Sequence, residues 1–408
     1  MAKRDYGEGA ITQRGENTWR LRYRIEGKPK RFSLTVQGTR KDAQKKLREL
    51  LKSGDDDAHI APDKITLAEW SEKWLALLAR KPSDAQAEQP RKRRRALINP
   101  RSLERYSQLM RLYILPTLGY RQLQQIQASE LDDLYIALEE KLAARTVQYT
   151  HVTLKACLNV AVRKGLLASN PADGAEAPSP AESDVGQTLD AEQLKALVHS
   201  FRKSALYPIV AVAAFTGARR NEILALPWTD LDADKRTLRI ERAIEETKAF
   251  GRTVKEPKTE RGKPTITIDD DPIALLLDVR AKHQRIIAGV PDGAPVDLSL
   301  IKLPADALMF PSMAGADFDC TRLRGPRAVT HEFCRQVRRR GFPKLRFHDL
   351  RGSHETALLD AGVPVHVVAS RCGHDPALML RSYAKRHDTS DTAAAVKIGK
   401  LLKGSLGD

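Results

Sequence analysis

The pattern of the chain changes at residues 172–187, a stretch rich in Ala, Pro, Ser, Asp and Glu that separates two differently patterned parts. Such a composition is typical of a linker between independently folded units. The 408 residues are enough for two or three domains, each with its own hydrophobic core. The sequence therefore predicts a multidomain α+β protein that is mainly helical.

The start of the chain alternates as a β-strand does. Residues 19–25 would place four apolar side chains on one face and three arginines on the other. A second alternating run at residues 31–36 and a capping pattern at Thr39 and Asp42 predict a small three-stranded sheet backed by a helix. The basic face either contacts DNA phosphates and base edges or is simply a solvated surface. The candidate DNA contacts are Arg20, Arg22, Arg24, Lys30 and Arg31.

The middle of the chain has helical spacing. A polar insert at residues 81–100 carries the basic run Arg-Lys-Arg-Arg-Arg, which is typical of a mobile loop and beside DNA would touch the backbone. Before this insert, we expect a first helix that begins after a cap at Thr66. Further helices are expected at residues 102–114, 129–142 and 146–164.

The part after the linker has a mixed pattern, which predicts a mostly helical domain with a small antiparallel sheet. An exposed segment is expected at residues 245–262, between two strands. The expected strands are residues 237–244 and 263–268, and the expected helices are 190–201, 207–215 and long helices from about 274 and 330.

The charge of the chain calls for a polyanionic partner. Lys and Arg number 69 against 52 Asp and Glu, a formal balance of +17, which favours nucleic acid over the alternative of a solubilising surface. The four cysteines have no paired spacing, so we expect reduced thiols. Cys372 lies close to His374, but no second pair completes a zinc site, and we expect no bound metal.

The motif Thr-Gly-Ala-Arg-Arg-Asn-Glu at residues 216–222 breaks the chain between two helices. Arg219 would project from the start of the second helix. Glu222 lies three residues on, on the same helical face, and could hold the Arg219 guanidinium. Arginines near helix starts are common, so this motif alone is not specific.

Three further motifs carry candidate catalytic side chains, and each has an ordinary alternative. A lysine in a Pro-Lys-Thr hairpin is usually solvent-facing. In Phe-His-Asp-Leu-Arg the histidine could cap the helix while the arginine pairs with Asp349. The tyrosine after Gly-His-Asp-Pro could be a half-buried core residue. The residues in question are Lys258, His348, Arg351, His374 and Tyr383.

Together these side chains would form a cationic pocket with one nucleophilic hydroxyl, which suits transesterification at a phosphodiester. Arg219 and Arg351 would grip the non-bridging oxygens and stabilise the pentavalent transition state. Tyr383 would attack phosphorus and form a covalent phosphotyrosine that preserves the energy of the bond.

Proton transfer falls to the remaining side chains. Lys258 would protonate the leaving 5′-oxygen, His348 would manage the tyrosine proton, and His374 would donate to a phosphate oxygen. The motifs lack the acidic cluster of a two-metal nuclease. Because one phosphodiester is exchanged for another, no cofactor is expected.

These motifs resemble those of the tyrosine recombinases, specifically the phage-type integrases. The resemblance rests on Thr-Gly-x-Arg-x-x-Glu, Pro-Lys-Thr, His-Asp-Leu-Arg, Gly-His and a tyrosine nine residues beyond that histidine. It extends over essentially the whole chain. It implies an enzyme that cuts and rejoins DNA through a covalent 3′-phosphotyrosine and so integrates and excises a phage or other mobile element. The implied parts are an arm-type DNA-binding domain at 1–58, a helical core-binding domain at 64–171, the linker at 172–187, a catalytic domain at 188–390 and a tail helix at 391–408.

The resemblance also implies partners. These are double-stranded DNA attachment sites and a homotetramer on paired sites, with a directionality factor and a host DNA-bending protein as candidates. No apolar run approaches the length of a membrane span, and the N-terminus lacks the apolar stretch of a signal peptide. We therefore expect no membrane association and action in the cytoplasm of a bacterial host, at the nucleoid.

The sequence departs from the family pattern in two places and leaves rival functions open. Gly352 follows the second arginine where many relatives carry His, and His354 comes two residues later; we expect little effect, because that position is not part of the pocket. The insert at 81–100 is long for a core-binding domain. The tail helix could pack on its own domain or on a neighbouring protomer. A type IB topoisomerase and a DNA-binding regulator without catalysis are the alternatives, disfavoured by the separate arm domain and by the intact catalytic set.

Overall fold

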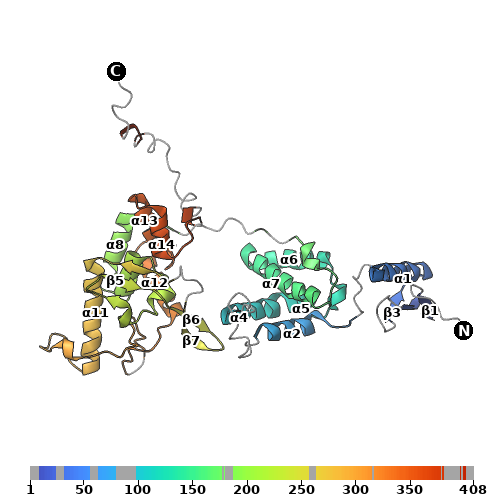
Figure 1. Cartoon of the computed structure of the whole chain (residues 1–408), viewed down its shortest axis with the longest axis horizontal. Coiled ribbons are helices and arrows are strands. Elements are labelled where there is room, and N and C mark those ends of the chain that lie inside the picture. The colour runs from blue at the N-terminus through green and yellow to red at the C-terminus, as the bar shows by residue number, and fades with distance from the viewer. Residues whose placement is uncertain are drawn as a thin grey trace, which may run out of the picture. The chain divides into compact units, whose positions relative to one another are not determined.

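The computed structural model describes residues 9–23, 32–55, 63–79, 98–176, 179, 187–256, 263–314, 317–377, 379–380, 396 and 398–400 (Figure 1). The chain divides into two compact units, Met1–Ser183 and Asp184–Asp408. The structure confirms a mainly helical fold with small antiparallel sheets, including a three-stranded sheet near the N-terminus. No helix in these ranges is both long and apolar enough to cross a bilayer.

The N-terminal sheet is antiparallel with strand order β1-β2-β3, and one helix covers one of its faces. Leu21 and Tyr23 are buried with Ala43 and Leu47 of that helix, as the alternation predicts. The predicted cap is present, because the Thr39 amide donates to Asp42 Oδ2 over 2.9 Å. The elements are β1 (Ala10–Gly15), β2 (Thr18–Tyr23), β3 (Phe32–Gln37) and α1 (Arg40–Asp55).

A helical bundle with a separate hydrophobic core makes up the rest of the first unit. Its centre includes Trp74, Leu131 and Leu154, and the indole of Trp70 donates to the carbonyl oxygen of Cys157 over 3.2 Å. The elements are α2 (Leu67–Ala79), α4 (Pro100–Leu109), the π-helical turn η1 (Met110–Ile114), α5 (Leu115–Leu118), η2 (Leu123–Gln125), α6 (Ala128–Glu139), α7 (Ala144–Arg163) and η3 (Pro171–Asp173).

The helix expected at residues 102–114 is not continuous. It begins earlier, at Pro100 after the Asn99 cap, and its α-helical part ends at Leu109. The amide of Leu115 then donates to the Met110 carbonyl five residues back. Pro116 explains the change, because proline has no amide hydrogen and its ring disturbs the preceding turn.

The linker begins later than the sequence predicts. Ala172 was expected to open it but is 1% exposed and belongs to the bundle core. The short helix η3 folds residues 171–173 onto the bundle, and the Glu176 amide donates to Asp132 over 2.7 Å. Small Ala and Pro residues allow a linker, but they also fit a tightly packed turn.

In its described residues, the second unit surrounds its own large core with helices and two small sheets, of order β4-β5-β8 and β6-β7. Its helices are α8 (Ala191–Ser200), α9 (Tyr207–Thr216), α10 (Arg220–Ile223), η4 (Trp228–Asp230), α11 (Asp270–Ala288), η6 (Leu298–Leu300), α12 (Pro326–Arg339), α13 (Asp349–Asp360) and α14 (Val365–Cys372). Its strands are β4 (Leu231–Asp232), β5 (Thr237–Arg239), β6 (Ala243–Thr247), β7 (Gly251–Lys255) and β8 (Thr265–Thr267).

The single strand expected at residues 237–244 is two strands in different sheets. Arg239 donates to the buried carboxylate of Asp230 over 3.0 Å, and Arg242 lies 3.7 Å from the same oxygen, so the chain bends between β5 and β6. The segment expected to be exposed from residue 245 therefore starts inside β6, where Glu245 is buried and pairs with Lys255 of β7.

Two helices start before their expected positions. Asp269 caps α11, which begins at Asp270 rather than near Ala274. Pro326 occupies the first turn of α12, four residues ahead of the expected start. In both cases polar residues or proline at the helix start hide the first turn from an apolar periodicity.

Candidate active site

The first motif forms a tight turn between α9 and α10. Gly217 ends α9 with a φ of 66°, in the left-handed region that favours glycine. Arg219 stands at the start of α10, and its amide donates to Glu222 Oε2 over 2.8 Å. Its guanidinium Nη1 lies 2.7 Å from Glu222 Oε1, so the predicted contact is present.

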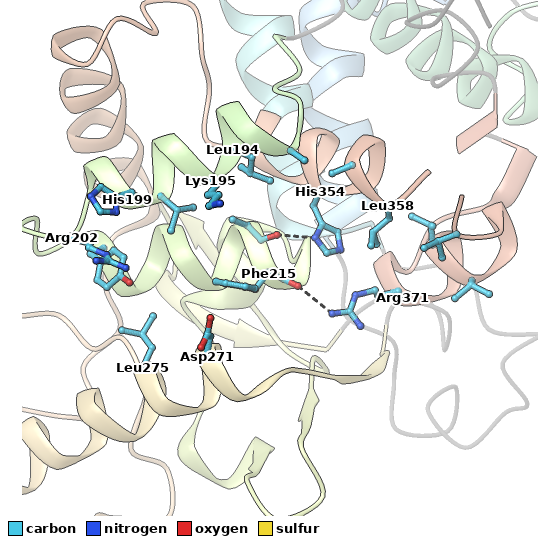
Figure 2. A pocket seen from close by; sticks show the side chains of 18 residues that line it. Leu194, Lys195, His199, Arg202, Phe215, Asp271, Leu275, His354, Leu358 and Arg371 are labelled. Carbon is cyan, nitrogen blue, oxygen red and sulfur yellow. Dashed lines mark hydrogen bonds between the residues drawn. The ribbon is translucent and has the colours of Figure 1, made fainter. Parts of the chain in front are cut away.

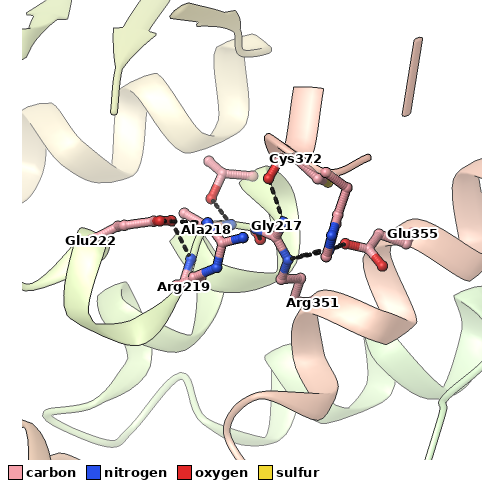
Figure 3. A network of polar contacts seen from close by, with 9 residues as sticks. Gly217, Ala218, Arg219, Glu222, Arg351, Glu355 and Cys372 are labelled. Carbon is pink, nitrogen blue, oxygen red and sulfur yellow. Dashed lines mark hydrogen bonds and ion pairs between the residues drawn. The ribbon is translucent and has the colours of Figure 1, made fainter. Parts of the chain in front are cut away.

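The second arginine is locked to the backbone of that turn. Arg351 of α13 is 3% exposed, and its Nη1 donates to the carbonyl oxygen of Gly217 over 2.9 Å (Figure 3). Its Nη2 donates to the carbonyl oxygen of Cys372, the last residue of α14. Its Nε lies 3.0 Å from Nε2 of His374. One guanidinium thus joins three segments of the second unit.

Glu355, one turn along α13, completes this cluster. Its Oε1 lies 3.1 Å from Nε of Arg351 and 2.9 Å from Nε2 of His374. Burial raises the pKa of Glu355, but the hydrogen bond from His374 and the charges of His374 and Arg351 outweigh it and leave the pKa below its usual value. The sequence reasoning missed this residue, although its i,i+4 spacing from Arg351 was a visible signal.

His348 stands at the start of α13 with its side chain open to solvent. Although the residue is exposed, neighbouring atoms displace part of the water around its ring, and this lowers the pKa of His348; the positive charges of Arg351 and Arg219 lower it further. The alternative explanation of this motif is wrong. His348 makes no capping hydrogen bond, and Asp349 pairs with Arg346 at 2.9 Å rather than with Arg351.

A model of the phage integrase family matches residues 187–390, which is half of the chain and includes this whole cluster. The chain belongs to the phage integrase family. It is therefore a tyrosine recombinase, a type of enzyme that breaks and rejoins DNA strands.

Two curated relatives of this recombinase align with it over most of both chains. A XerC-like tyrosine recombinase of Caldanaerobacter subterraneus subsp. tengcongensis is 25% identical, over 82% of this chain and 83% of that protein. An integrase of Streptomyces ambofaciens is also 25% identical, over 90% of this chain and 88% of that protein.

Solved structures of integrases share the fold. The Tn1549 transposon integrase, in complex with a circular intermediate DNA, is 19% identical with a TM-score of 0.61, over 83% of this chain and 99% of that one. The lambda integrase tetramer bound to a Holliday junction is 16% identical with a TM-score of 0.51, over 90% of this chain and 95% of that one.

The described part of the recombinase brings together five of the seven residues singled out for catalysis and its support. Lys258 and Tyr383 lie outside the described residues, as do Arg24, Lys30 and Arg31 of the basic face. The insert at 81–97 and most of the tail at 391–408 lie outside as well. The five residues brought together are Arg219, Glu222, His348, Arg351 and His374.

His354 supports the turn of the first motif from behind. It is 6% exposed, and its Nδ1 lies 2.8 Å from the carbonyl oxygen of Ala214. A Cβ added to Gly217 would come within 2.6 Å of His354 Cδ2. Burial lowers the pKa of His354 to about 4, so the ring is neutral at physiological pH. His354 therefore packs against the Gly217 turn and is not one of the side chains that would contact the phosphate.

His354 also lines a cavity of about 1040 Å³ whose walls come from α8, α9, α11, α13 and α14 (Figure 2). Arg371 anchors one wall by donating to the carbonyl oxygens of Thr267 and Phe215, over 2.9 and 3.2 Å. The lining is apolar with a few charged side chains, among them Lys195 and Asp271. Neither Arg219 nor Arg351 lines this cavity.

Proposed function

We propose that this recombinase is an integrase that cuts and rejoins DNA at specific attachment sites through a covalent 3′-phosphotyrosine on Tyr383. By doing so it would integrate and excise a phage or other mobile element. The observation that carries the proposal is the convergence of Arg219 and Arg351 on the Gly217 turn, with His348 and His374 beside them.

The arrangement of Arg351 suits a phosphate. A guanidinium has five N–H donors, one on Nε and two on each Nη nitrogen. Within the protein, Nη1 and Nη2 each donate to one carbonyl, and Nε donates to Nε2 of His374. One hydrogen on each Nη nitrogen is left for the non-bridging oxygens of a scissile phosphate, in bidentate geometry. Arg219, whose side chain is 41% exposed, would supply the second cation.

The proposed reaction combines these side chains with Tyr383 and Lys258. Tyr383 Oη forms a bond to phosphorus while the bond from phosphorus to the 5′-oxygen breaks. His348 would accept the tyrosine proton, which its lowered pKa favours because the ring is neutral at physiological pH. Lys258 would give a proton to the leaving 5′-oxygen, and His374 would donate to a phosphate oxygen.

The basic face of the N-terminal sheet would bind arm-type DNA sites. Arg20 lies directly across from Thr12 and Thr35 on the neighbouring strands, and Arg22 lies across from Ser33. Because opposite residues share a face, the two arginines and three exposed hydroxyl groups form one polar surface. Cations and hydroxyls are the usual donors to DNA phosphates.

We infer a division of labour along the chain that rests on these two surfaces and on the family. Residues 1–58 would bind arm sites, 64–171 would bind the core site, and 188–390 would cut it. The chain would act as a homotetramer on paired double-stranded sites, in the cytoplasm of a bacterial host. A directionality factor and a DNA-bending protein are candidate partners.

A nicked duplex that carries the crossover site tests the proposal. Wild-type protein should form a covalent complex that survives on a denaturing gel, and Tyr383→Phe should form none. Arg351→Ala should bind the duplex without forming the adduct. No adduct from the wild type on a verified cognate site, or an adduct from Tyr383→Phe, would overturn the assignment.

A further inference from the structure

One carboxylate oxygen of Glu355 contacts both Arg351 and His374. Oε1 lies 3.1 Å from Nε of Arg351 and 2.9 Å from Nε2 of His374, and these two nitrogens lie 3.0 Å apart. The three atoms therefore form a nearly equilateral triangle. The side chain of Glu355 is 14% exposed, and its Oε1 atom is shielded from solvent.

One hydrogen bond in this triangle joins the two nitrogens. Nε of Arg351 donates to Nε2 of His374 over 3.0 Å. The carboxylate of Glu355 lies beside this bond, at ion-pair distance from Arg351, and offsets the positive charge of the buried guanidinium.

We propose that Glu355 is a positioning residue of the recombination reaction: its carboxylate offsets the charge of the Arg351 guanidinium and holds that side chain, and the His374 ring to which it donates, in place for the scissile phosphate. Both donors are then set before the scissile phosphate arrives. This inference rests on the proposed function, because it concerns donors to the phosphate. The low pKa of Glu355 agrees with it, since the carboxylate stays ionised at neutral pH.

The surroundings of Glu355 argue against a purely structural role. Two carbonyl oxygens already hold the Nη nitrogens of Arg351, so its guanidinium has backbone partners without the carboxylate. A buried ion pair is also weak evidence for stability, because desolvation offsets the attraction. The other titratable groups that feel the charge of Glu355 are His348, His354 and Cys372.

The main test compares Glu355→Gln with wild type in single-turnover adduct formation on the nicked duplex. Glutamine keeps the shape but removes the negative charge that holds Arg351, so cleavage should slow by roughly 100-fold while DNA binding changes little. Glu355→Asp keeps the charge on a shorter side chain and should recover part of the rate. If the Gln variant does not fold, Glu355→Asp still tests the proposal.

A second substrate separates positioning from structure. A methylphosphonate at the scissile position replaces one non-bridging oxygen by methyl and removes the negative charge that Arg351 balances. If Glu355 acts through Arg351, the rates of wild type and Glu355→Gln should come within about threefold of each other on this substrate. A structural defect would slow both substrates equally.

Asp230→Asn is the matched control, because Asp230 is also a buried carboxylate that faces two basic side chains in the same unit, Arg239 and Arg242. It should lower the melting temperature without changing the ratio of rates on the two substrates. The inference is overturned if Glu355→Gln cleaves at the wild-type rate, or if its defect is the same on both substrates. A Tyr383-dependent adduct from wild type in either case leaves the proposed function intact.

Discussion

Arg351 donates a hydrogen bond of 2.9 Å from Nη1 to the carbonyl oxygen of Gly217, two residues ahead of Arg219. The second arginine is therefore tied to the turn that presents the first, although the two are far apart in the chain. A change in the turn would move both cations together. The spacing between the two guanidinium groups is set by backbone geometry rather than by the flexible side chains alone.

Gly217→Ala should be more damaging than an ordinary replacement of a left-handed glycine. The φ of 66° costs a non-glycine residue about 1–2 kcal/mol. The new Cβ would also lie 2.6 Å from His354 Cδ2 and 3.0 Å from Cys372 Sγ, and such overpacking costs a further ~1–3 kcal/mol. Thermal unfolding should show a large fall in melting temperature, and adduct formation should be lost.

Gly289→Ala is the control for that substitution. Gly289 ends α11 with a φ of 65°, and nothing lies within 4 Å of its Cβ position. It should therefore lose only the backbone contribution and keep its cleavage activity. Equal destabilisation of the two variants would show that the contact of Gly217 with His354 and Cys372 has no energetic weight.

Glu222→Gln should reduce cleavage more than stability. The carboxylate contacts both the amide and the guanidinium of Arg219, and the exposed Arg219 side chain has few other restraints. A displaced cation near the scissile phosphate can cost on the order of 100-fold in rate. Single-turnover adduct formation measures the rate, and circular dichroism on heating measures the stability.

Glu332→Gln provides the comparison for Glu222. Glu332 forms the same kind of i,i+3 pair with Arg335, but on the more exposed surface of α12. Exposed pairs contribute at most about 1 kcal/mol, so this variant should cleave as the wild type does. If both variants lost the same amount of activity, the proposed hold of Glu222 on Arg219 would be wrong.

The residues of the site differ in how far the sequence could predict them. The Arg219–Glu222 contact lies within one helical turn, where spacing alone determines proximity. Glu355 also shows helical spacing from Arg351, but its meaning depends on His374, which follows a different helix. The π-helical turn before Pro116 and the buried Ala172 were missed for a related reason. Apolar periodicity finds helices and strands, whereas breaks and packed turns depend on tertiary contacts.

The basic face of the N-terminal sheet should be separable from catalysis. Changing Arg20, Arg22 and Arg24 together to Ala should abolish binding to arm-type duplexes and leave cleavage of short core duplexes measurable. Affinity falls as salt rises, and each lost phosphate contact should make the slope of log affinity against log salt less steep by about 0.9. Electrophoretic mobility shifts at several salt concentrations give that slope.

A variant with the same loss of charge on the other side of the sheet is the control. Lys41, Lys45 and Arg48 are exposed on α1, the helix that covers the opposite face. Their triple replacement by Ala also removes three positive charges. Arm binding that falls equally in both triple variants would contradict a specific role for the strand face and favour general electrostatic attraction.

Two buried histidines should make the second unit sensitive to acid. Burial lowers the pKa of both His283 and His354 to about 4, against an ordinary value of 6.5. The unfolded chain therefore binds protons first as the pH falls, so stability is full above pH 6.5 and decreases progressively between 6.5 and 4. His283→Phe should reduce that decrease and leave cleavage unchanged, since the ring packs against Trp228 at 5.9 Å, away from the arginines. Melting temperatures of wild type and His283→Phe from pH 8 to 4.5 measure the effect, and parallel curves would show that His283 is protonated as readily in the folded protein as in the unfolded chain.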